Sequence, residues 1–85
     1  MPNKSLNSST IEEDYSPIAS VADLGLLLRA QRKAQKLTLH DAAALSGVSI
    51  QFLHDLETGK QSIQMGRALK YALMLGIKLS AWQTS

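Results

Sequence analysis

The chain carries few of the side chains that catalysis or metal binding requires. It has no cysteine, and its two histidines, His40 and His54, lie 14 positions apart with neither the HxxxH nor the HExxH spacing of a metal site. No Gly-x-Ser-x-Gly nucleophile motif occurs, and no glycine-rich phosphate loop follows a strand. We therefore predict no catalytic residue, no metal, no cofactor and no enzymatic activity.

The positive charges are the next candidates for chemistry, because they are clustered. Residues 1–19 hold one lysine against three carboxylates, a balance of −2, whereas residues 20–85 hold eight lysines and arginines against four carboxylates, a balance of +4. Four of those eight cations fall within eight residues: Arg29, Arg32, Lys33 and Lys36. This density favours binding to a polyanion. A solvated helix face explains the cluster equally well.

Length and composition limit what can position these residues. Eighty-five residues with 45% hydrophobic and 19% charged side chains predict a single small globular domain. The absence of cysteine favours the reducing cytoplasm. The longest apolar stretch, around residues 71–77, is far too short to cross a membrane. The polar residues 1–19 lack the apolar core of a secretory signal and are interpreted as a flexible N-terminal arm.

Periodicity and caps predict an all-α fold of four to five helices from Ser20 onward. Helices are expected over residues 21–35, 39–46, 50–57 and 64–75, with Ser20, Thr38 and Ser49 as N-caps. In the last helix the apolar residues with helical spacing are Met65, Leu69 and Leu73, with Ala68 and Ala72 as further candidates. Phe52 and Tyr71 are expected in the core.

The C-terminal residues change period. Residues 77–81 alternate apolar and polar side chains, which predicts a short β-strand. A lone strand must pair, and the same strand of a second copy is the expected partner. We therefore predict a helical domain over residues 20–76 and a dimerisation tail over 77–85. The predicted dimerisation residues are Ile77, Leu79, Ala81 and Trp82.

The two central helices have the spacing of a helix-turn-helix. Ala43 is small enough to let the helices cross, and Gly47 permits the tight turn between them. Val48 and Leu53 point inward, and Ser49 begins a second helix whose outer residues are free to enter a groove.

Residues Leu24 to Leu79 resemble the phage-repressor-like (XRE-type) helix-turn-helix regulators. The resemblance rests on Leu24-Gly25, Leu28-Arg29, Arg32-Lys33, Leu37-Thr38, Asp41, Ala43, Gly47-Val48-Ser49, Phe52-Leu53, Leu56-Glu57 and Gly59-Lys60. The ending Leu69, Leu73 and Leu75 to Leu79 is similar to that of the HipB-like antitoxins. This chain departs from the family at Lys36, where Gly is usual, at Leu39, where Gln is usual, and at Asp41-Ala42.

The resemblance implies a homodimeric transcriptional repressor that places residues 50–57 of each subunit in the major groove of a palindromic double-stranded DNA operator. It further implies the antitoxin of a HipA-type kinase toxin, which represses its own operon. The alternative is a protein-interaction module that restrains a partner protein and binds DNA weakly. Leu39 and Asp55 favour this alternative slightly.

Roles follow for the outward residues. Gln51 is the expected base reader, since its amide can pair with adenine, while Ile50 can contact a thymine methyl, His54 a base or phosphate, and Asp55 a cytosine amine. The alternative role for Asp55 is to repel phosphate in wrong registers. The predicted phosphate contacts are Thr38, Lys60, Lys33, Lys36 and Arg29. By resemblance, Arg32 and Glu57 form a partly buried ion pair between the first and third helices.

Overall fold

Four helices make up the described part of the chain, which comprises residues 16–81 and 83 of a computed structural model. They are α1 (Val21–Ala34), α2 (Leu39–Ser46), α3 (Ile50–Glu57) and α4 (Met65–Met74). The predicted all-α arrangement is confirmed, and α2 and α3 have the predicted bounds. The helix α1 is one residue shorter than predicted at its end, and α4 one residue shorter at each end. Most of the predicted N-terminal arm, and Trp82, lie outside the described residues.

Side-chain caps explain where the first three helices begin. The Ser20 hydroxyl accepts a hydrogen bond from the Asp23 backbone N–H at 3.1 Å, and Ser49 does the same for Phe52 at 3.0 Å. At α2, Thr38 and Asp41 cap one another reciprocally. Each cap satisfies an N–H group that the helix itself leaves without an acceptor. The first residues of α1, α2 and α3 are therefore determined by side chains that are close in sequence.

A residue with positive φ follows each of the four helices, at Lys36, Gly47, Gly59 and Gly76. Gly47 adopts φ 69° after α2, and the next residue, Val48, donates its N–H to the Ala43 carbonyl at 3.2 Å. The turn between α2 and α3 thus needs a left-handed residue, which glycine provides without steric cost. Lys36 has φ 61° after α1, where related regulators usually have glycine. A side chain in this conformation costs about 1 kcal/mol.

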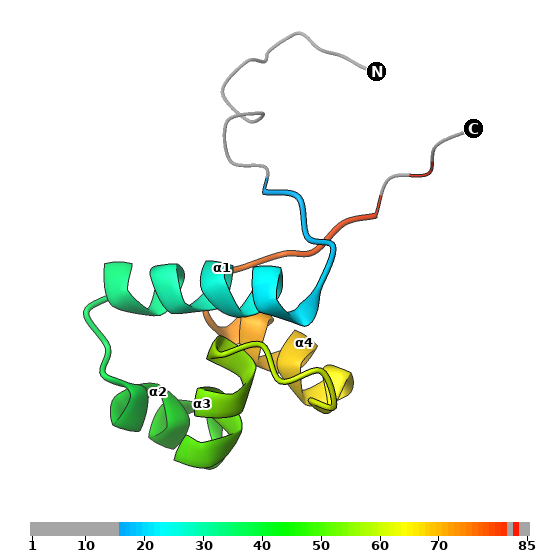
Figure 1. Cartoon of the computed structure of the whole chain (residues 1–85). Coiled ribbons are helices and arrows are strands. Elements are labelled where there is room, and N and C mark those ends of the chain that lie inside the picture. Colours follow the sequence, from blue (N-terminus) through cyan, green and yellow to red (C-terminus); the bar gives the residue numbers. More distant parts are fainter. Residues whose placement is uncertain (1–15, 82, 84–85) are drawn as a thin grey trace, which may run out of the picture.

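All four helices contribute to one core. In Figure 1, α1 lies above the other three helices. The buried apolar side chains are Leu24 and Leu28 of α1, Ala42 and Ala43 of α2, Phe52, Leu53 and Leu56 of α3, Ala68, Tyr71 and Ala72 of α4, and Leu75. Val48 is partly buried against this cluster, as the helix-turn-helix spacing predicts. The expected core positions of Phe52 and Tyr71 are confirmed.

The face that α4 buries in the core is not the face that carries Leu69 and Leu73. The helix buries Ala68, Tyr71 and Ala72, and leaves Leu69 and Leu73 exposed. Gln31 lies in α1, and Gln35 is the cap residue that follows it. The side-chain amides of both donate to the Leu75 carbonyl, at 3.2 and 2.7 Å. They hold the end of α4 against α1 and satisfy one of its free carbonyl groups.

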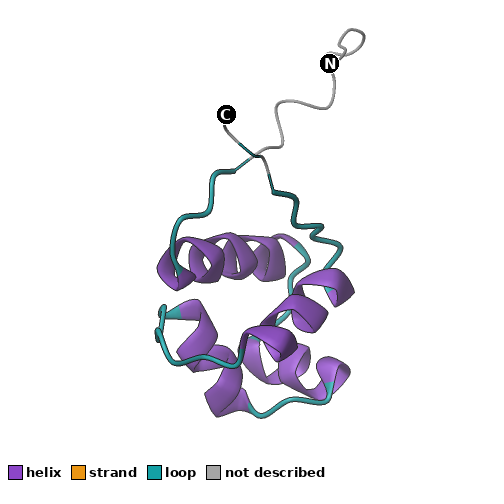
Figure 2. Ribbon diagram, turned by 90° about the vertical axis from the view of Figure 1, so that its right-hand side faces the viewer, coloured by secondary structure: helices purple, strands orange, loops and turns teal. Residues whose placement is uncertain are grey.

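The predicted C-terminal strand is not formed in the single chain. Residues 77–81 are irregular, and no strand occurs among residues 16–81 and 83. The physical reason is that a strand needs a neighbour for its hydrogen bonds, and the helical domain offers no sheet edge. Figure 2 shows that this segment and residues 16–20 leave the domain on the same side. Within the described residues, no helix is long and apolar enough to cross a membrane.

Candidate nucleic-acid interface

The helix α3 has one buried and one exposed face. Phe52, Leu53 and Leu56 anchor it in the core, while Ile50 and Gln51 are exposed at its first turn. Because Ser49 caps it and three apolar side chains fix its rotation, the outward residues are held on a rigid element. A short, rigid helix with exposed N-terminal residues is the arrangement with which helix-turn-helix proteins read the major groove.

Three of the predicted DNA-contacting residues are linked to one another. The Gln51 Nε2 donates to Asp55 Oδ1 at 2.9 Å, and Lys60 Nζ lies 3.5 Å from Asp55 Oδ2. The hydrogen bond from Gln51, followed by the charge of Lys60, lowers the pKa of the Asp55 carboxyl below its ordinary value. Asp55 therefore contacts both the expected base reader, Gln51, and the expected phosphate contact, Lys60.

His54 and Ile50 complete the exposed surface of α3. Ile50 is 46% exposed, so its aliphatic group is accessible for contact with a thymine methyl group. His54 is also exposed, and its Nδ1 lies 3.8 Å from Asp55 Oδ1. All four predicted base-reading residues thus lie on α3. Gln51 is hydrogen-bonded to Asp55 and His54 lies beside it.

The predicted phosphate contacts are divided between two places. Thr38 is exposed at the start of α2, and Lys60 is exposed two residues after the end cap of α3. Lys33 and Lys36 are exposed at the end of α1. Since α1 meets the C-terminal end of α3, these two lysines lie toward the opposite end of α3 from Gln51. An eight-residue helix is about 12 Å long, so the α1 lysines are suited to flanking phosphates and not to bases.

The arginine and glutamate predicted to pair lie together in the protein interior. Arg32 Nε and Nη2 donate to the two Glu57 oxygens at 2.6 and 2.9 Å, and Arg32 Nη1 donates to the Leu37 carbonyl at 2.8 Å. The hydrogen bonds with Glu57 raise the pKa of the Arg32 guanidinium. Arg29 Nε lies 4.0 Å from Glu57 Oε1. Arg29 therefore lies near a carboxylate that already pairs with Arg32, and its side chain remains 52% exposed.

Arg67 is a candidate that the sequence patterns did not single out. Its guanidinium carbon lies 5.7 Å from the centre of the Phe52 ring, so it lies against α3 from the first turns of α4. The separation of 15 positions along the chain hides this proximity. The cation–π contact places Arg67 against α3, and because its side chain is exposed, Arg67 is a further candidate for a phosphate contact.

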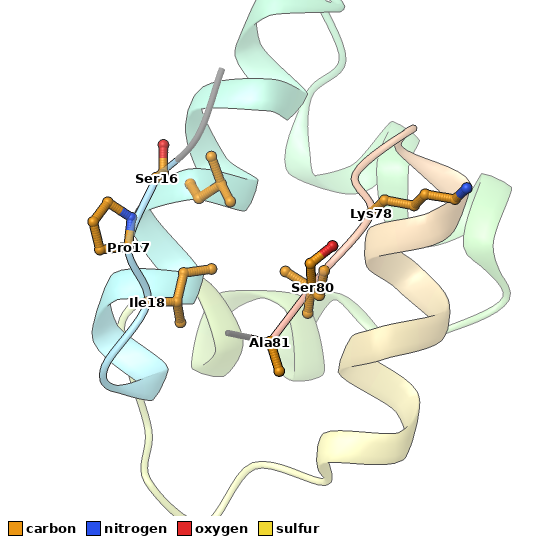
Figure 3. Close-up of a pocket in the computed structure, with 8 residues that line it drawn as sticks. Ser16, Pro17, Ile18, Lys78, Ser80 and Ala81 are labelled. Carbon is orange, nitrogen blue, oxygen red and sulfur yellow. The ribbon is translucent and has the colours of Figure 1, made fainter. Parts of the chain in front are cut away.

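The described part of the chain holds no cluster of histidine and acidic residues that could bind a metal ion. A groove of about 590 Å³ lies instead between the two ends of the described segment. Ser16, Pro17 and Ile18 line one side, and Lys78, Ser80 and Ala81 the other (Figure 3). The groove is distant in sequence from α3 and is lined by the predicted dimerisation segment.

A comparison with known families agrees with this geometry. The helix-turn-helix family model matches residues 28–82, well over half of the chain. The chain belongs to the helix-turn-helix family. This helix-turn-helix protein is also 39% identical over 62 residues to a protein of Sinorhizobium fredii (strain NBRC 101917 / NGR234) named "Uncharacterized HTH-type transcriptional regulator y4mF". The match covers 73% of this chain and 82% of the relative. Family membership supports DNA-binding regulation and leaves the narrower antitoxin group to be tested.

Proposed function

We propose that this helix-turn-helix protein is a sequence-specific repressor that binds a palindromic operator as a homodimer. The observation that carries the proposal is α3, whose buried Phe52, Leu53 and Leu56 fix Gln51 and Ile50 outward at its N-terminal end. An amide and an aliphatic group in this place suit an adenine edge and a thymine methyl, and Lys60, Thr38 and Arg67 supply contacts to phosphate. The name of the Sinorhizobium relative supports a role in transcription.

The test is a selection from random duplexes followed by binding measurements on the selected site. The variant Gln51→Ala should lose about tenfold or more in affinity for the selected site and little on random DNA, because a bidentate base contact contributes roughly 1–3 kcal/mol of discrimination. Equal losses on both duplexes would contradict the base-reading role.

Lysine variants test the phosphate contacts in the same assay. Lys60→Ala should weaken binding to every duplex and reduce the slope of log affinity against log salt by about 1. Lys70→Ala, at an exposed lysine on α4, is the matched control and should change neither quantity. Affinity that does not fall steeply with salt in the unaltered protein would contradict DNA binding driven by phosphates.

The dimer is supported by an apolar surface beside the C-terminal tail. Leu69 and Leu73 of α4 and Ile77 and Leu79 of the tail line a shallow groove of about 250 Å³. Leu69 is 42% and Leu73 60% exposed, so two large apolar side chains of α4 stay uncovered in the single chain. Pairing of residues 77–81 between two copies would satisfy their backbone groups and cover this surface, which adds Leu69 and Leu73 to the predicted dimerisation residues.

We further propose that the partner regulated by this protein is a HipA-type kinase toxin. The support is the resemblance of residues 69–79 to HipB-like antitoxins. A kinase-like reading frame beside this gene, and copurification of its product with this protein, are the expected observations. A neighbourhood without such a frame would contradict the antitoxin role and leave the DNA-binding proposal unchanged.

The second candidate is a protein-interaction module with weak DNA binding. Two exposed leucines outside the proposed dimer surface favour it, namely Leu26 of α1 and Leu45 of α2, which are 62% and 66% exposed. The salt titration separates the two candidates, because a protein-binding module has no reason to show the steep salt dependence of phosphate contacts.

A further inference from the structure

The carboxylate of Asp55 is engaged by its own protein. Its Oδ1 accepts from Gln51 Nε2 at 2.9 Å, and its Oδ2 faces Lys60 Nζ at 3.5 Å. The Asp55 side chain is 21% exposed, whereas those of Lys60 and His54 are 57% and 60% exposed. With both oxygens occupied and most of its surface covered, Asp55 is poorly placed to accept from a base itself.

The bond to Gln51 determines which way the amide faces. A carboxylate can only accept hydrogen bonds, so it can hold the amide nitrogen but not the amide oxygen. The planar amide then turns Oε1 away from Asp55 and leaves one N–H of Nε2 unbonded. A free glutamine could rotate and offer either its oxygen or its amino group to DNA.

The polarity of the amide decides which bases it can recognise. In the major groove, an oxygen pairs with a base amine, and adenine alone presents an amine beside the N7 acceptor that the remaining N–H needs. An outward amino group would instead suit the acceptors of guanine or thymine. With its amide held in one orientation, Gln51 recognises adenine, whereas a freely rotating Gln51 would accept several bases.

The charge of Asp55 is compatible with a surface that faces phosphates. Lys60 opposes it at 3.5 Å, and His54 Nδ1 lies 3.8 Å from Oδ1. The ion pair with exposed Lys60 is weak, so the lysine can turn to a phosphate when DNA is bound. The group Gln51, Asp55 and Lys60 thus joins a base-reading side chain to a phosphate-binding one.

We propose that Asp55 is a positioning residue, which fixes the polarity of the Gln51 amide and thereby makes α3 select adenine. The proposal rests on the proposed DNA-binding function. It assigns Asp55 no contact with a base, in contrast to the cytosine contact predicted from the sequence.

Binding to duplexes with each of the four bases at the position read by Gln51 tests the proposal. That position is identified as the one at which Gln51→Ala abolishes discrimination. Asp55→Ala and Asp55→Asn should each reduce the preference for adenine there by about tenfold, since an alanine cannot hold the amide and an asparagine can hold either end of it. In the Gln51→Ala background, Asp55→Ala should cause no further loss of discrimination. Lys70→Ala, on α4 and outside the proposed DNA-reading surface, is the control and should keep the preference for adenine.

A second measurement uses the protein without DNA. The ¹⁵N order parameter of the Gln51 side-chain amide should be high and should fall in Asp55→Ala, because the restraint is then lost. An unchanged adenine preference in Asp55→Ala, or an unchanged order parameter, would overturn the proposal. A loss of cytosine preference elsewhere in the site would show instead that Asp55 reads a base. If the unaltered protein selects no sequence, the proposed function fails, and the order parameter still decides whether Asp55 holds the amide.

Discussion

Gly25 is the residue at which α1 lies closest to α3. A Cβ atom built on it would lie 2.2 Å from the Leu56 carbonyl oxygen and 2.9 Å from that of Glu57. Both are backbone atoms of a helix, which cannot move aside as a flexible side chain would. Glycine is therefore required here for space, and not for an unusual backbone angle.

Gly25→Ala is expected to reduce the free energy of unfolding by about 3 kcal/mol or more, because α1 must move away from α3. Urea denaturation measures this loss. Gly66→Ala in α4 is the control, since a Cβ there meets no atom within 4 Å. It should stabilise the protein by roughly 0.5–1 kcal/mol through the better helix propensity of alanine. A similar result for the two variants would contradict the close approach.

Tyr71 has a buried hydroxyl that makes no hydrogen bond within the described residues. Burial, with the nearby negative charge of Glu57, raises its pKa to about 12. Above pH 10 the unfolded chain loses this proton while the folded protein keeps it, so stability should fall from pH 10 to 12. Tyr71→Phe should be as stable as the unaltered protein at pH 7 and should lose less stability over that pH range. Denaturation curves at several pH values test this, and identical alkaline losses would contradict it.

At the scale of elements, the buried ion pair joins α1 to the end of α3. Removing one partner leaves the other charged and buried, so Glu57→Ala is expected to cost about 3–5 kcal/mol. The double variant Arg32→Met with Glu57→Leu should lose less than Glu57→Ala, because it removes both charges. The exposed pair of Asp55 and Lys60 is the control, and Lys60→Ala should change stability by less than about 1 kcal/mol. A loss in Glu57→Ala as small as that of the control would contradict the proposed coupling of the two helices.

The helices themselves were predictable because their limits are set by neighbouring residues. The Ser20, Thr38 and Ser49 caps and the Gly47 turn act within four positions of the chain. The rotation of α4 about its own axis was not predictable, because apolar residues lie on two adjacent faces of this helix. The face with the small Ala68 and Ala72 allows close packing, so the larger leucines stay outside.

At the scale of the whole molecule, the exposed leucines of α4 predict an assembly. Replacing Leu69 and Leu73 together by serine should convert a dimer into a monomer in sedimentation velocity, because it removes apolar area at the proposed contact. The matched control is Leu45→Ser on α2, which is equally exposed and lies outside that surface. Deletion of residues 77–85 should also weaken the dimer. Monomers in the unaltered protein, or dimers in all variants, would contradict the proposal.

The sequence by itself determined the four helices, the turn between α2 and α3, and the outward position of Gln51. These depend on caps, on a left-handed glycine and on the period of apolar residues, all of which act over short distances along the chain. Only the tertiary structure decided that Arg29 lies beside Glu57 and that Arg67 lies over Phe52. Such contacts depend on how helices are rotated and packed against one another, which no local pattern records.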